Sequence, residues 1–208
     1  MILSTMTAKK LTDMVFVIDR SGSMSGFESD TIGGFNSTID KQKKEEGDAI
    51  VSTVLFSDKV EVLHDRVGLK EIGKMTEEEY YVNGCTALLD AVGGTIERIK
   101  HEQAKDKENV PDATLFVIIT DGLENASREF SYRKVKGLIE KQKEAGWDFL
   151  FLGANIDVAA EAERIGIARN NTVEFRSDSR SIHAMYDCVS RRVSCARSSG
   201  TFDLEKDI

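Results

Sequence analysis

Three segments of the sequence combine carboxylate and hydroxyl side chains in a spacing that could bind a cation. The first is Asp19-Arg20-Ser21-Gly22-Ser23, which follows a continuous apolar run and contains one carboxylate and two hydroxyls at alternate positions. Alternate residues of an extended segment point to the same side. Asp19, Ser21 and Ser23 can therefore converge on one point.

The other two segments add a hydroxyl and a second carboxylate. Thr86 lies in Asn83-Gly84-Cys85-Thr86-Ala87, and Asp121 follows a second apolar run in Thr120-Asp121-Gly122. Together the three segments offer two carboxylates and three hydroxyls, all hard oxygen donors. This set suits Mg²⁺ or Mn²⁺, suits Ca²⁺ less well, and suits zinc poorly.

The elements that must position these residues alternate between strand and helix patterns. Apolar runs at 14–18 and 114–120 are typical of strands buried on both faces. Further strands are expected at 49–56, 60–67, 147–152 and 171–175, and helices at 27–39, 88–99, 132–142, 158–165 and 179–197. The turn at 57–59 predicts a hairpin between the second and third strands.

This alternation predicts a doubly wound α/β domain with helices on both faces of the sheet. The sheet is expected to be mostly parallel, with one antiparallel edge strand from the hairpin. Ligand sites in such sheets lie at the carboxyl ends of the strands, where Asp19 and Asp121 are expected. Each segment alone could instead be helix-capping or turn chemistry, since serine, aspartate and Thr-Asp-Gly are common there. Their joint occurrence at three element ends favours a cation site.

With these residues in place, the sequence resembles the von Willebrand factor type A (VWA) family, whose metal-ion-dependent adhesion site (MIDAS) has an Asp-x-Ser-x-Ser motif. Asp19, Ser21 and Ser23 match that motif, and Thr86 and Asp121 match the family threonine and aspartate. The resemblance covers about residues 14–175 in order of elements. In character the chain is closest to the short intracellular prokaryotic members.

The resemblance implies a three-layer, Rossmann-like sheet with strand order 3-2-1-4-5-6 and a metal at its carboxyl edge. Ser21, Ser23 and Thr86 would be direct or near-direct ligands, and Asp19 and Asp121 would bind directly or through water. A glutamate or aspartate of a partner protein would complete the coordination. The implied function is a non-enzymatic, Mg²⁺-dependent protein-binding module.

Residues beside the motif define a candidate partner-binding rim. Glu124 and Asn125 follow Asp121, and Glu28 follows the serine loop. These three side chains are predicted to surround the site, either contacting a partner or remaining solvated. The family pattern adds no catalytic residue.

Two other functions compete with protein binding. The same ion could serve a phosphoryl-transfer or hydrolytic enzyme, but the second position after Asp19 is Ser21, where haloacid-dehalogenase-type phosphatases carry aspartate. A nucleotide binder would need a Gly-rich first turn, and this turn carries a carboxylate where a phosphate would lie. His64, His101 and His183 are isolated in sequence, so no zinc spacing is present.

The composition limits the classes of binding partner and indicates the cellular compartment. The 208 residues carry a net charge of −8, which argues against a nucleic-acid binder. Near the C-terminus, Arg191, Arg192 and Arg197 form a local basic patch, interpreted as a solvated helix face.

No apolar run is long enough to span a membrane and no secretory signal is visible. An odd number of cysteines, Cys85, Cys188 and Cys195, then favours reduced thiols in the cytoplasm, although their roles stay open.

The chain shows no linker, repeat or break in composition. We expect an N-terminal extension at 1–12, one VWA domain at 13–197, and a polar C-terminal tail at 198–208.

Overall fold

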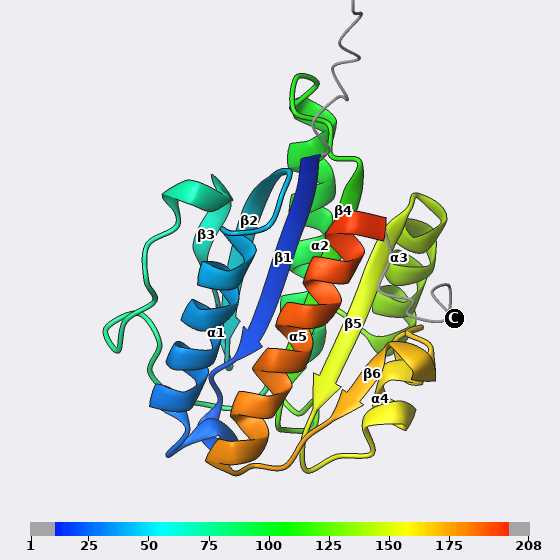
Figure 1. Cartoon of the computed structure of the whole chain (residues 1–208). Coiled ribbons are helices and arrows are strands. Elements are labelled where there is room, and N and C mark those ends of the chain that lie inside the picture. The colour runs from blue at the N-terminus through cyan, green and yellow to red at the C-terminus, as the bar shows by residue number, and fades with distance from the viewer. Residues whose placement is uncertain (1–10, 200–208) are drawn as a thin grey trace, which may run out of the picture.

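The computed structural model describes residues 11–199, which form a six-stranded sheet between two layers of helices (Figure 1). The strands are β1 (Leu11–Asp19), β2 (Asp48–Phe56), β3 (Val60–Gly68), β4 (Ala113–Thr120), β5 (Trp147–Gly153) and β6 (Thr172–Glu174). The helices are α1 (Glu28–Gln42), α2 (Leu88–Lys105), α3 (Tyr132–Glu144), α4 (Val158–Arg164) and α5 (Ser179–Ser199). Of the predicted extension and tail, residues 1–10 and 200–208 lie outside the described part.

The strand order is β3-β2-β1-β4-β5-β6, which confirms the predicted topology. β1 lies in the centre and pairs in parallel with β2 and β4, while β2 and β3 form the antiparallel hairpin. β1 and β4 are buried along almost their whole length, as expected for continuous apolar runs covered on both faces. Because the parallel strands run the same way, their carboxyl ends meet at one edge of the sheet.

The sheet separates two apolar cores. Alternate residues of β1 point to opposite faces, so Phe16 packs in the core beneath α1 and α5, and Val17 packs in the core beneath α2, α3 and α4. Figure 1 views the sheet from the side covered by α1 and α5. This arrangement confirms the three-layer, doubly wound fold.

Helix α5 is fastened tightly to α1. Gly34 of α1 lies against the ring of Tyr186, where a Cβ on the glycine would come within 2.1 Å of a ring carbon. At the far end of the two helices, the Arg197 guanidinium donates hydrogen bonds to Gln42 and to the backbone carbonyls of Glu46 and Gly47. The interpretation of Arg197 as part of a solvated basic patch was therefore wrong, because this side chain is buried and caps the end of α1. Arg191 is exposed and Arg192 partly so.

Within residues 11–199, no helix is both long enough and apolar enough to cross a membrane.

Candidate metal centre

The carboxyl ends of β1 and β4 bring the first and last motif segments together. Asp19 is the last residue of β1, and Asp121 directly follows β4. The two strands pair in register, with Ile18 opposite Ile119. This parallel pairing places two carboxylates that are far apart in the sequence at the same point of the sheet edge.

The three predicted hydroxyl ligands form one hydrogen-bonded row. The Thr86 hydroxyl donates to Ser21 Oγ at 3.0 Å, and Ser21 Oγ lies 3.1 Å from Ser23 Oγ. Ser21 and Thr86 are buried, whereas Ser23 is exposed. The row thus runs from the interior to the surface, and the site opens to solvent at Ser23.

Asp19 is held rigidly by its neighbours. Its carboxylate accepts hydrogen bonds from the Ser21 N–H at 2.7 Å and from the Thr120 hydroxyl at 2.6 Å. The Tyr80 hydroxyl donates to its backbone carbonyl at 2.7 Å. Burial raises the pKa of Asp19, although the hydrogen bonds from Thr120 and Ser21 oppose that rise. The carboxylate therefore has a fixed orientation in a poorly solvated position.

Asp121 differs from Asp19 because its carboxylate has no partner. The residue is 2% exposed, and neither of its buried carboxylate oxygens accepts a hydrogen bond from the protein. Burial raises the pKa of Asp121 to about 6; the nearby Ser23 hydroxyl opposes that rise, and the negative charge of Asp19 adds to it. Buried carboxylates are normally paired or bound to a cation. The orphaned oxygens are therefore what a cation site requires.

Gly122 leaves room beside these groups. A Cβ at this glycine would lie 3.1 Å from Thr86 Oγ1 and 3.2 Å from Ser23 Oγ. Both distances are tighter than ordinary contacts, so a side chain here would crowd the hydroxyl row. The five oxygen side chains and this open space together fit a small, hard divalent cation.

Backbone hydrogen bonds join the three loops of the site. The Gly22 N–H donates to the Gly84 carbonyl, and the Asn83 N–H donates to the Arg20 carbonyl. On the other side, the Asn125 N–H donates to the Thr86 carbonyl, and Asn125 Oδ1 accepts from the Thr86 N–H at 2.9 Å. The Thr86 loop is thus fixed between the loops that carry Ser21 and Asp121.

The three predicted rim residues all make local hydrogen bonds. Glu124 accepts from the Leu89 N–H at the start of α2 and from the Ser127 N–H and hydroxyl. Asn125 orients Thr86, as described above, and the Glu28 carboxylate accepts from the Gly26 N–H. Each of the three residues therefore helps to hold a loop of the site in place. Contact with a partner stays a prediction for all three.

Two residues that hold Asp19 were missed by the sequence analysis. The sequence singled out Thr120 only as part of a turn, and it did not single out Tyr80. The position of Thr120, one residue before Asp121 at the end of a buried strand, was a signal that its hydroxyl faces the site. No comparable signal marked Tyr80, which lies 61 positions from Asp19.

The histidines do not gather at this site. His64 of β3 stacks on Phe35 of α1, His183 of α5 lies 3.2 Å from Asp30 of α1, and His101 is exposed on α2. Throughout residues 11–199, no group of three or more His, Cys, Asp or Glu side chains lies close enough together to hold a metal. A cation at the candidate site would therefore depend on the hydroxyls as well as on the two carboxylates.

The chain matches a known family over most of its length. The model of the von Willebrand factor type A domain matches residues 13–187, most of the chain. The chain belongs to the VWA family. No match was found among the curated proteins.

Solved structures with the same fold include byssus and pilus proteins. Proximal thread matrix protein 1 from the mussel byssus, with a zinc-occupied MIDAS motif, is 16% identical with a TM-score of 0.60, covering 89% of this chain and 46% of that one. The vWF domain of the type V pili tip protein Mfa5 from Porphyromonas gingivalis is 11% identical with a TM-score of 0.66, covering 91% and 97%. Manganese-loaded TRAP protein from Plasmodium vivax is 16% identical with a TM-score of 0.57, covering 85% and 72%. The chain thus spans about half the length of the mussel protein. At these identities the likeness shows the fold.

Proposed function

We propose that this VWA domain is a non-enzymatic, metal-dependent protein-binding module. Asp19, Ser21, Ser23, Thr86 and Asp121 would hold Mg²⁺, with Mn²⁺ or Ca²⁺ as alternatives. The bound ion would supply a positive charge with an open coordination position, which an aspartate or glutamate of a partner protein fills. The chain's own residues would hold the ion and orient the incoming carboxylate.

The orphaned Asp121 carboxylate carries this proposal. Two buried carboxylates at one sheet edge repel each other, and the Ser23 hydroxyl offsets the burial of Asp121 only in part, since the pKa of Asp121 stays raised. A divalent cation held by these residues would offset both the repulsion and the burial. The zinc and manganese in the mussel and Plasmodium structures support a divalent ion here.

The exposure of Ser23 supports docking from outside. Four of the five proposed ligands are buried, so an ion at this site would reach solvent on the Ser23 side. An octahedral ion bound by few side chains keeps water positions that another carboxylate can take. The net charge of −8 opposes acidic partners at long range, and the ion would offset that repulsion locally.

We also propose that the protein is cytoplasmic and of the short prokaryotic type. Cys85, Cys188 and Cys195 are free, with Cys85 exposed. An exposed free thiol is more compatible with a reducing compartment than with an oxidising one.

Capture of partners with and without metal tests the proposed function. Immobilised wild-type protein should retain specific partners from cell extract in Mg²⁺ and release them in EDTA. Thr86→Ala should retain none in either buffer, because it removes one hydroxyl ligand, while Thr76→Ala, an exposed threonine of a neighbouring loop, should behave as wild type. Equal recovery of the same partners in Mg²⁺ and EDTA would contradict metal-mediated docking. Replacement of one acidic residue in a captured partner should abolish its retention.

A further inference from the structure

Large exposed apolar side chains are concentrated at the metal end of the domain. Among the described residues they are Val60, Tyr81, Val110 and Leu123. Tyr81 and Leu123 lie in the loops on either side of the proposed ligands, and Val60 begins β3 beside the same edge. Val110 lies at the opposite end, between α2 and β4.

Tyr81 is exposed but packs against the loop of the proposed ligands. It is 46% exposed, and the Arg20 guanidinium packs over its ring at 4.6 Å from the ring centre. Arg20 is itself buried, bonded to Glu61 of β3 at 2.7 Å and to the Glu79 carbonyl. Since Arg20 lies between Asp19 and Ser21, the tyrosine ring is attached directly to the metal-binding loop.

Leu123 lies on the other side of the proposed ligands, in a loop that is itself anchored. It is 56% exposed and follows Gly122, where a Cβ would lie 3.1 Å from the Thr86 hydroxyl and 3.2 Å from the Ser23 hydroxyl. The loop after Leu123 is held by the Glu124 carboxylate. This carboxylate accepts hydrogen bonds from the Leu89 N–H at the start of α2 and from the Ser127 N–H. An exposed leucine on a rigid loop costs little conformational entropy when a partner covers it.

The sheet order places these two side chains on opposite flanks of the site. Tyr81 contacts Arg20, which reaches toward β3, whereas Leu123 follows β4. β1, which carries Asp19, lies between β3 and β4 in the order β3-β2-β1-β4. A chain that crosses the site with a carboxylate at its middle would therefore meet an apolar group before and after it.

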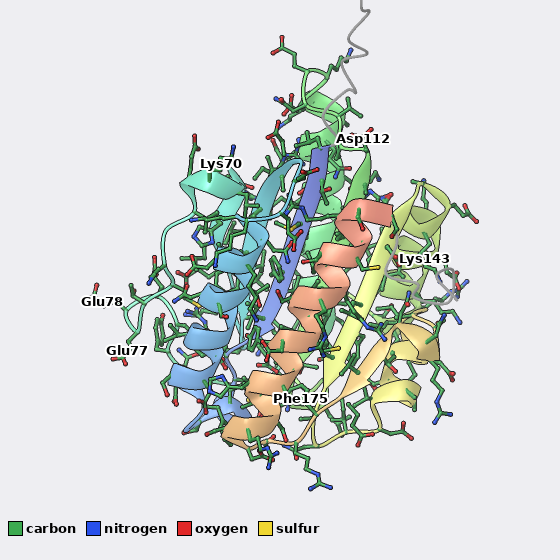
Figure 2. All side chains as sticks on the ribbon, viewed as in Figure 1. Lys70, Glu77, Glu78, Asp112, Lys143 and Phe175 are labelled. Carbon is green, nitrogen blue, oxygen red and sulfur yellow. The ribbon has the colours of Figure 1, made fainter. Side chains whose placement is uncertain are left out.

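We propose that the partner segment carries one aspartate or glutamate flanked on both sides by large apolar residues, which pack on Tyr81 and Leu123. This inference rests on the proposed function, since the central carboxylate is the one that binds the ion. Additional acidic residues in the segment would be disfavoured, because Glu77 and Glu78 project from the loop that leads to Tyr81 and would repel them. Both glutamates lie far from Lys70 and Asp112, which are at the other end of the domain (Figure 2).

Three short synthetic peptides of equal length test the proposal. One has a central glutamate between leucines, the second has the same glutamate between serines, and the third has glutamine between leucines. In Mg²⁺, the leucine-flanked glutamate peptide should bind wild-type protein at least about tenfold more tightly than the serine-flanked one, because apolar area is buried on each side. The glutamine peptide should bind no better in Mg²⁺ than in EDTA.

Substitutions in the protein locate the effect. The double variant Tyr81→Ser with Leu123→Ser should reduce the leucine advantage to within about twofold, as expected when the apolar contacts are lost. Val110→Ser, the matched control with 65% exposure, should keep the full advantage. The Mg²⁺-dependent rise in melting temperature, measured for each variant, shows that it is folded and still binds the ion.

The outcomes separate this inference from the function on which it rests. If Mg²⁺ stabilises the protein but the two glutamate peptides bind equally, or neither binds, the apolar-flank proposal is wrong and metal binding stands. If Val110→Ser loses the leucine advantage as the double variant does, the proposal is also wrong. If no ion stabilises the protein and no peptide depends on Mg²⁺, the proposed function itself fails.

Discussion

Asp121→Asn should make the protein more stable in EDTA and insensitive to Mg²⁺. The substitution removes a buried, unpaired negative charge that lies near Asp19. We expect a gain of about 1–2 kcal/mol in the free energy of unfolding without metal. Wild-type protein should instead gain about 2.7 kcal/mol when Mg²⁺ is present at about 100 times its dissociation constant. Urea unfolding in EDTA and in Mg²⁺ measures both effects.

Asp40→Asn is the matched control for this prediction. Asp40 is exposed on α1, so its substitution changes the net charge equally without touching the site. Its response to Mg²⁺ should equal that of the wild type. If Asp121→Asn destabilises the protein in EDTA, or if it keeps the full Mg²⁺ effect, then Asp121 is not an orphaned ligand and the description of the site is wrong.

Arg197→Ala should cause a large loss of stability without a direct effect on the site. The buried guanidinium bonds to Gln42 and to the Glu46 and Gly47 carbonyls, and so joins the end of α5 to the end of α1. Hydrogen bonds from charged donors are the stronger kind, so we expect a loss of about 2–4 kcal/mol in the free energy of unfolding. Arg191→Ala, at an exposed position of the same helix, should change stability by less than about 0.5 kcal/mol.

Denaturant unfolding of both arginine variants measures this difference. The Mg²⁺-dependent gain in stability should remain in Arg197→Ala, since the arginine lies at the opposite end of the domain from the ligands. Equal, small effects for Arg197→Ala and Arg191→Ala would show that the α1–α5 contact does not depend on the cap.

The fold was largely predictable because the signals in the sequence are local. Buried strands such as 114–120 are continuous apolar runs bounded by polar turn residues, and helices such as α2 show regular apolar spacing. The ends of elements were less predictable. β1 begins at Leu11, where it pairs with Asp48 of β2, and α5 continues to Ser199, so both elements extend beyond the predicted domain limits.

The candidate ligands were predictable because each lies at or beside the end of a recognisable element, but the residues that hold them in place were not. Arg197 was taken for a surface residue because its neighbours Arg191 and Arg192 are polar. Its burial depends on the end of α1, more than 150 positions away. Tyr80 and Arg20 likewise act through contacts with distant residues. Interactions set by tertiary packing leave no pattern in one sequence.

The environment of the Asp121 carboxylate also depends on tertiary structure. Thr-Asp-Gly at a strand end is an ordinary turn, and nothing in those residues shows that both carboxylate oxygens are buried without a donor. Asp19, by contrast, is satisfied by Thr120 and Ser21. The difference between the two carboxylates emerges only when β1 and β4 pair.

Anomalous diffraction near the manganese edge, from crystals of the protein grown with Mn²⁺, shows directly whether these side chains bind an ion. We expect one strong anomalous peak among the hydroxyls of Ser21, Ser23 and Thr86 and the Asp121 carboxylate, with the hydroxyls turned toward the ion. A strong peak only at another place would contradict the proposed site. So would the absence of any peak, with the Ser21 and Thr86 hydroxyls still hydrogen-bonded to each other.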